Sequence, residues 1–248
     1  MLQVQEDRYN GLIIETETIQ PTVSEFEQAL TNLLQEAQKN QKNLIWLDLT
    51  TKRASHIAVA TKLDFIFHNC EAHRITLVHR VKPDAYIPVP PTHTIGVGAV
   101  VINDNNELLM VRDRIHTSSS LYKLPGGMLE HADEFAQTVE REVYEETGII
   151  ATLDKAVGFL NSHPFMYNKS NIYAIFQLTA QTHEINVIDT YEIEKALWMN
   201  IDEFFAHPEM SEFQKRIVRF ALENQGMQLI EFEQDLKRKG QKHIEFYA

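Results

Sequence analysis

The stretch that decides the fold runs from Leu124-Pro125-Gly126-Gly127 to Arg141-Glu142-Val143-Tyr144-Glu145-Glu146-Thr147-Gly148. A glycine-rich loop leads into a predicted helix dense in acidic residues. That helix is expected to end at Gly148, because glycine readily adopts the left-handed conformation that closes helices. At about 100° per residue, Glu146 falls between Phe135 and Val139 on the helical wheel. The wheel therefore predicts that the Glu146 side chain points toward the protein body.

An acidic cluster on a helix usually forms a solvated face, and that is the alternative interpretation here. It fits Glu146 poorly, because carboxylates that converge beside the protein body repel one another and lose hydration. Hard divalent cations relieve both costs, since Mg²⁺ and Mn²⁺ take oxygen ligands. The pattern therefore favours a divalent metal site over a charged surface.

Residues 127–149 resemble the Nudix box, the 23-residue signature of the Nudix hydrolases. The core of that signature is complete at Arg141, Glu142, Val143, Glu145, Glu146, Gly148 and Ile149. Asp133 stands where the family pattern has glutamate, which shortens a carboxylate that supports the site. The resemblance implies an α/β/α sandwich around a mixed sheet over residues 92–205.

The same resemblance implies hydrolysis, dependent on Mg²⁺ or Mn²⁺, of a diphosphate that links a nucleoside to another moiety. Glu142, Glu145 and Glu146 would bind the metal, with the Gly126 carbonyl as a possible addition. Arg141 would orient the glutamates through a salt bridge. Bound metals offset charge on the diphosphate and lower the pKa of a coordinated water.

A further carboxylate outside the box is expected to activate the attacking water, and Glu192 is the predicted residue. The box helix supplies only one wall of the cleft, and the acidic loop before the strand at Trp198 can supply another. Two alternatives stay open: Glu192 and Glu194 are solvated loop acids, or Glu194 has the role. If neither acts, Glu145 is the candidate base.

A boundary between domains is predicted at residues 83–91, which hold four of the eight prolines. Proline fixes φ and lacks an N–H, so this stretch is expected to be an extended connector; a loop inside one domain is the alternative. The predicted domains are 1–85, 92–205 and 206–248. The last is expected to add a helix over 211–223 and a hairpin of 228–232 with 243–247, packed on the Nudix domain.

The first 85 residues read as a small α/β unit in ββαβαβ order. Strands are expected at 12–14, 44–49 and 75–78. One helix is predicted to begin at a capping box of Ser24 and Glu27, and another covers 57–67. Matches over nearly the whole chain resemble a Nudix subgroup with an N-terminal acetyltransferase-like domain, which includes plant ADP-ribose/NADH diphosphatases and the animal antisense-growth-factor-gene product. The glycine-rich turn for coenzyme A is missing, so we expect a non-catalytic domain that supports a homodimer.

In the central domain, strands are expected at 95–102 and 107–112, joined by a turn at 103–106, and also at 171–178 and 197–199. The net charge of −12 argues against a general binder of nucleic acid or of anionic membranes. No apolar run approaches the roughly 18–20 residues of a membrane span. With no signal-peptide pattern and a single cysteine, Cys70, expected to be buried, a cytoplasmic protein is predicted.

The predicted substrate is a small nucleotide derivative, with ADP-ribose first and NADH second. Pro164 lies sixteen positions after Gly148, a spacing that resembles ADP-ribose hydrolases. Tyr167 lies near the position where dinucleoside-polyphosphate hydrolases often carry tyrosine. The alternative function is a non-catalytic nucleotide sensor or interaction protein with a Nudix fold.

Overall fold

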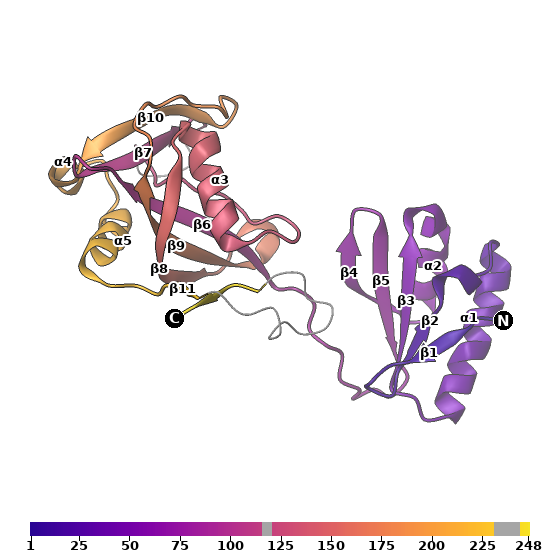
Figure 1. Cartoon of the computed structure of the whole chain (residues 1–248). Coiled ribbons are helices and arrows are strands. Elements are labelled where there is room, and N and C mark those ends of the chain that lie inside the picture. The colour runs from indigo at the N-terminus through magenta and orange to yellow at the C-terminus, as the bar shows by residue number, and fades with distance from the viewer. Residues whose placement is uncertain (116–120, 231–243) are drawn as a thin grey trace. The chain divides into compact units, whose positions relative to one another are not determined.

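The computed structural model describes residues 1–115, 121–230 and 244–248. The chain forms two compact units, Met1–Thr92 and His93–Ala248 (Figure 1). Residues 83–92 contain no helix or strand. Within the described residues, no helix is long and apolar enough to cross a membrane.

The first unit is a five-stranded sheet with two helices, and its sheet order is β1-β2-β3-β5-β4. The strands are β1 (Val4–Glu6), β2 (Leu12–Ile14), β3 (Leu44–Thr50), β4 (Ile66–Glu71) and β5 (Arg74–Arg80). The helices are α1 (Val23–Lys39) and α2 (Ala54–Lys62), with short 3₁₀ turns at Thr16–Thr18 and Thr51–Arg53. Buried side chains of α1, such as Phe26 and Leu30, pack with those of the central strands, such as Leu47 and Leu77, in one apolar core. Burial of these side chains stabilises the unit.

Three sequence predictions for this unit are wrong. The capping residue of α1 is Thr22, not Ser24, and its hydroxyl oxygen accepts the Glu25 N–H. Thr22 and Glu25 have the same three-residue spacing as the predicted pair but lie two residues earlier. Helix α2 ends at Lys62, and residues 66–71 form β4 because pairing with β5 outweighs the helical pattern. Cys70 is exposed, since it lies on this edge strand.

The second unit has a mixed five-stranded sheet in the order β10-β7-β6-β9-β8. Its strands are β6 (His93–Ile102), β7 (Glu107–Asp113), β8 (Ala151–Ser162), β9 (Ser170–Ala180) and β10 (Ile193–Asn200). Strands β6 and β9 are parallel, and the other neighbours are antiparallel. The predicted hairpin of 95–102 and 107–112 is confirmed as β6 and β7, and the other predicted strands lie within β9 and β10.

Helices cover both faces of this sheet (Figure 1). Val139 and Val143 of α3 (Phe135–Thr147) pack against one face in a core that includes Phe176. A second core on the other face holds Phe204 of α4 (Ile201–Ala206) and Val218 of α5 (Glu212–Glu223). The predicted α/β/α sandwich around a mixed sheet, preceded by a smaller α/β unit, is therefore confirmed.

The C-terminal segment belongs to the second unit. Strands β11 (Leu229–Ile230) and β12 (Phe246–Tyr247) pair antiparallel, while residues 231–243 of the predicted hairpin lie outside the described residues. The Glu245 carboxylate accepts the backbone N–H groups of Phe135 and Ala136 at 2.5 and 2.9 Å. Because these donors begin α3, a C-terminal acid caps the helix that carries the acidic cluster.

Several strand ends and loops meet at one edge of the sheet. β6 and β9 both begin there, since His93 pairs with Ser170, and β7 ends there where Asp113 pairs with Ile193 at the start of β10. The loop between β8 and β9, with a short 3₁₀ turn at Met166–Asn168, lies at the same edge. Topology thus brings together loops that are far apart in the sequence.

Candidate active site

The glycine-rich loop lies directly on β6. Val97 donates its N–H to the Gly127 carbonyl, and Ala99 donates to the Pro125 carbonyl, both at 2.8 Å. Gly126 has φ +149°, and a Cβ there would collide with the Val97 carbonyl, while a Cβ on Gly127 would collide with the Glu142 carboxylate. Position 126 therefore requires glycine, and the lack of a side chain at Gly127 leaves room for the Glu142 carboxylate of α3.

Glu146 points inward, as the helical wheel predicts, and its residue is only 3% exposed. One carboxylate oxygen, Oε2, accepts the Gly126 N–H at 2.8 Å, and Oε1 lies 3.4 Å from the Lys123 ammonium. Burial raises the pKa of Glu146 to about 8, although Lys123 and the Gly126 N–H act in the opposite direction. A solvated face is thus the wrong interpretation for this carboxylate.

Arg141 organises the more accessible acids of the same helix. Its Nη1 lies 3.0 Å from Glu142 Oε1 and 2.9 Å from Glu145 Oε2, and Nη2 lies 3.5 Å from Asp133 Oδ2. Burial alone would lower the pKa of Arg141, but the carboxylates of Glu142 and Glu145 outweigh it and raise the pKa. Arg141 therefore joins Asp133, Glu142 and Glu145 in one ion-pair network. Helix α3 ends at Gly148 in the predicted left-handed conformation.

The donor set suits a hard divalent cation, although the described side chains do not converge as a metal-binding group of three. Arg141 and Lys123 instead contact the acids. The carbonyls on either side of Gly126 accept hydrogen bonds from β6, whereas no backbone hydrogen bond to the Gly126 carbonyl is found among the described residues. Carboxylates and a carbonyl are the oxygen ligands that Mg²⁺ and Mn²⁺ prefer.

Asp133 contacts the turn at the start of α3 as well as Arg141. Its Oδ2 accepts the Glu130 N–H at 3.0 Å and lies 3.4 Å from the Thr138 hydroxyl. The shorter acid thus closes the turn that follows the glycine-rich loop. The ion pair between Arg141 and Asp133, at 3.5 Å, is the longest of the three that Arg141 forms with these acids.

Replacing Asp133 with glutamate is expected to leave kcat unchanged or to raise it several-fold. The longer side chain reaches closer to Arg141, while the loss of the turn contact is local and partly exposed, worth about 1 kcal/mol. Steady-state kinetics together with a thermal melt check this. A collapse of activity or of stability would show that the shorter acid is a specific structural requirement.

Glu192 lies in the loop before β10, and hydrogen bonds of the backbone hold this loop in place. The Asp189 N–H donates to the Glu145 carbonyl at 2.8 Å, Asp189 Oδ1 accepts the Tyr191 and Glu192 N–H groups, and the Arg114 N–H donates to the Glu192 carbonyl. The Glu192 Oε1 atom lies 3.5 Å from the Lys123 ammonium. The structure therefore brings Glu192 to the same cation as Glu146.

Glu194 lies elsewhere, because it is already on β10. Its Oε2 is 3.1 Å from the Nε of Arg112, on the neighbouring strand β7. The two loop acids that the sequence left as alternatives thus have different partners.

The sequence analysis missed three residues of this region. Lys123 Nζ is 2.7 Å from Asp113 Oδ1, and the Tyr173 ring fills the space beside Gly98 and Gly126. Burial, and then the nearby Glu146, raise the pKa of the Tyr173 hydroxyl. Of the three, only Lys123 could have been found from the sequence, because it directly precedes the Leu-Pro-Gly-Gly run. Asp113 and Tyr173 are brought to the site by strand pairing.

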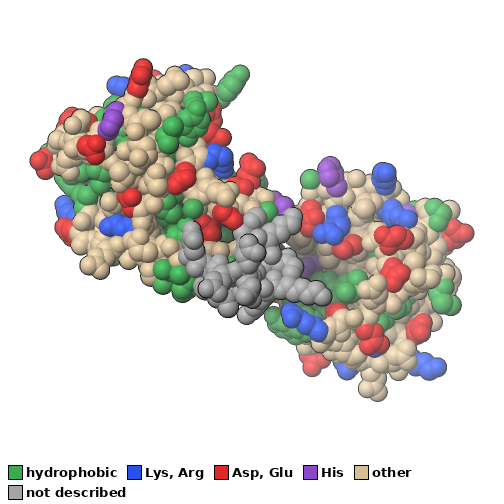
Figure 2. All heavy atoms as spheres, in the orientation of Figure 1, with side chains coloured by type: hydrophobic (Ala, Val, Ile, Leu, Met, Phe, Trp, Pro, Cys, Tyr) green, Lys and Arg blue, Asp and Glu red, His purple; other side chains and the backbone are tan. Residues whose placement is uncertain are grey.

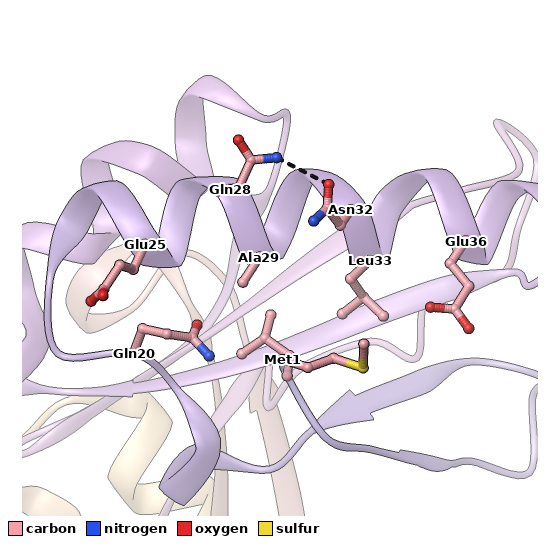
Figure 3. A pocket seen from close by; sticks show the side chains of 9 residues that line it. Met1, Gln20, Glu25, Gln28, Ala29, Asn32, Leu33 and Glu36 are labelled. Carbon is pink, nitrogen blue, oxygen red and sulfur yellow. Dashed lines mark hydrogen bonds between the residues drawn. The ribbon is translucent and has the colours of Figure 1, made fainter.

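A cavity of about 430 Å³ in the first unit lies along α1, with Glu25 and Glu36 toward its ends and the bonded amides of Gln28 and Asn32 on its wall (Figure 3). Its lining includes neither Lys nor Arg, which gives a phosphate no counter-charge. On the visible face of each unit, basic side chains are interspersed with acidic ones (Figure 2).

Comparison with known proteins identifies the family of both units. A family model described as NUDIX domain matches residues 92–220, more than half of the chain, and one described as Nudix hydrolase domain matches residues 2–81. Among curated proteins, Nudix hydrolase 7 of Arabidopsis thaliana is 31% identical over 84% of this chain and 75% of its own length.

Two further relatives extend this comparison. Nudix hydrolase 8 of the same plant is 28% identical over 84% of this chain, which spans only 57% of that protein. The human nucleoside diphosphate-linked moiety X motif 6 is 26% identical over 89% of this chain and 72% of its own length. The chain belongs to the Nudix hydrolase family, in the subgroup that the plant proteins and the human protein represent.

Proposed function

We propose that this protein hydrolyses the diphosphate bond of a nucleoside diphosphate linked to another moiety, and that it requires Mg²⁺ or Mn²⁺. The observation that carries the proposal is the buried Glu146 carboxylate. Glu146 lies on the same helix as Arg141 and Glu142, and its carboxylate accepts the Gly126 N–H of the glycine-rich loop. A buried acid of this kind is costly unless a cation or a reaction uses it. The name of the human relative refers to a nucleoside diphosphate-linked moiety, which supports this substrate class.

In this proposal, Glu142, Glu145 and Glu146 hold the metal, with the Gly126 carbonyl as a further ligand. When bound, the metal supplies charge neutralisation for the diphosphate and a water of lowered pKa. Arg141 orients Glu142 and Glu145, which it contacts at 3.0 and 2.9 Å. Glu192 accepts a proton from the attacking water, because its loop lies at the sheet edge where α3 presents its acids.

A screen of nucleotide derivatives tests the reaction directly. ADP-ribose, NADH, dinucleoside polyphosphates and nucleoside triphosphates are incubated with Mg²⁺ or with Mn²⁺, and the phosphomonoester products are measured after coupling to a phosphatase. We expect hydrolysis of ADP-ribose first, NADH second, and loss of all activity with a chelator. Hydrolysis of none of these compounds would contradict the proposal.

The preference for ADP-ribose rests on one loop. Pro164 lies between β8 and β9, at the same sheet edge as the loop that carries Glu192. Tyr167 of that loop is 87% exposed and so is open to stack on a base. A faster reaction with a dinucleoside polyphosphate would favour the tyrosine-based alternative.

The sensor alternative makes a different prediction for the same site. A protein that only binds a nucleotide has no need for a buried acid such as Glu146 beside two further glutamates. The screen separates the two functions, since a sensor would bind ADP-ribose without forming AMP. We favour catalysis because Arg141, Glu142, Glu145 and Glu146 are all present and in contact with their partners.

We further propose that the unit of residues 1–85 is non-catalytic and supports a cytoplasmic homodimer. Among its described residues before Gly96, the only glycine is Gly11, whose Cβ position is filled by the Asp7 carboxylate. No glycine-rich turn is therefore available to approach a pyrophosphate.

The full-length chain is expected to elute as a dimer and to show no binding of coenzyme A. Multi-angle light scattering measures the first property and isothermal titration calorimetry the second. A monomeric mass would remove the assembly role, and measurable acetyl transfer would remove the non-catalytic assignment.

A further inference from the structure

Lys123 contacts acids from three separate elements of the second unit. Its ammonium lies 2.7 Å from Asp113 at the end of β7, 3.4 Å from Glu146 on α3 and 3.5 Å from Glu192 in the loop before β10. Burial alone would lower the pKa of this lysine, but these carboxylates outweigh it and keep the ammonium charged. This one cation thus links side chains of β7, of α3 and of the loop before β10.

The backbone of Lys123 is held at a fixed point. Its N–H donates to the Val111 carbonyl at 2.8 Å, and the Val111 N–H donates back at 2.9 Å. Two residues later, the Pro125 carbonyl accepts the Ala99 N–H of β6. The lysine therefore extends from the sheet itself and not from a free loop.

Glu192 is different, because its side chain is 60% exposed although the backbone of its loop is held by hydrogen bonds. The Tyr191 and Glu192 N–H groups donate to the Asp189 carboxylate. The Arg114 N–H donates to the Glu192 carbonyl, and the Asp189 N–H donates to the Glu145 carbonyl of α3. An exposed acid samples many rotamers unless a partner selects one. Among the described residues, the Glu192 carboxylate forms its one ion pair with the Lys123 ammonium.

We propose that Lys123 is the positioning residue that holds the Glu192 loop and its carboxylate against the Glu146 side of the site. Asp113 anchors the ammonium, whose remaining contacts face Glu146 and Glu192. In this role Lys123 acts through Glu192 and makes no contact of its own with the reacting atoms. The kinetic part of this inference rests on the proposed function, whereas the structural part does not.

The first test measures amide hydrogen exchange at residues 188–193 in the metal-free, full-length protein. Lys123→Met should raise exchange at Tyr191 and Glu192 by at least about five-fold, because local opening becomes easier. Glu192→Gln, which removes the other end of the contact, should raise it similarly. Lys123→Arg keeps the charge and should stay near the wild type. Lys195→Met removes an exposed lysine of β10 and is the matched control.

The second test is kinetic. Lys123→Met should lower kcat with little change in KM, and the double variant Lys123→Met/Glu192→Gln should be no slower than Glu192→Gln alone, because both changes remove one function. Effects that multiply would overturn the proposal. So would exchange that is unchanged in both single variants, or exchange in Lys123→Arg as fast as in Lys123→Met.

The exchange measurement separates this inference from the proposed function. A chain that hydrolyses nothing but shows the expected exchange pattern would retain the role of Lys123 and lose the catalytic assignment. If Lys123→Met does not fold, Glu192→Gln with Lys195→Met as control still decides the structural claim. Equal exchange in those two variants and the wild type would then overturn it.

Discussion

Replacing Glu146 with glutamine is expected to lower kcat by at least about two orders of magnitude, the typical effect of losing a key electrostatic group in an active site. Glu146 is the most buried acid of the cluster, and one oxygen is already held by the Gly126 N–H. Glutamine keeps the size of the side chain and can still accept that hydrogen bond. It removes the negative charge on which the proposed metal site depends.

Metal binding gives this prediction a second measurement. Mn²⁺ or Mg²⁺ should raise the melting temperature of the wild type, because a ligand that binds only the folded state stabilises it. The shift should be largely lost in Glu146→Gln. Near-normal activity of that variant, with metal still required, would remove Glu146 from the ligand set.

The stability of the metal-free variant is the control for misfolding. Burial raises the pKa of Glu146 from 4.5 to about 8, so the folded state holds a proton that the unfolded state releases as pH rises above 4.5. The metal-free wild type therefore loses stability between those values. Glutamine does not titrate, so Glu146→Gln should be at least as stable as the wild type at pH 8, and lost activity cannot then be ascribed to unfolding.

Local sequence was sufficient for the helix that carries the site. The end of α3 at Gly148 and the inward direction of Glu146 both follow from helical geometry and from glycine's conformational freedom. Strands β6 and β7 were equally predictable, since a polar turn separates two apolar runs. In each of these cases the determining residues lie within about two helical turns or one hairpin of each other.

Features that depend on distant partners could not be predicted in the same way. Strand β8 (Ala151–Ser162) mixes polar and apolar residues without a clear period, and its register with β9 shifts twice. Helix α2 stops early because residues 66–71 pair with β5. The contacts of Lys123 require β7, α3 and the loop before β10 to meet, which no local pattern encodes.

Replacing Glu192 with glutamine is expected to lower kcat by about two orders of magnitude with little change in KM. A general base contributes about 10²–10⁴-fold to a reaction and acts in the transition state, not in substrate binding. The structure favours Glu192 over Glu194 for this role, because Glu192 shares the Lys123 ammonium with Glu146, whereas Glu194 lies 3.1 Å from Arg112 on β7.

Glu194→Gln is the matched control, since it makes the same chemical change two residues along the chain. Its kcat should stay within a few-fold of the wild-type value. For both variants, kcat and KM are measured with ADP-ribose at saturating Mg²⁺. An effect in Glu194→Gln alone would transfer the role to that residue. If neither variant is impaired, Glu145 becomes the candidate base, because its carboxylate is 45% exposed and held 2.9 Å from Arg141, so a water can reach it.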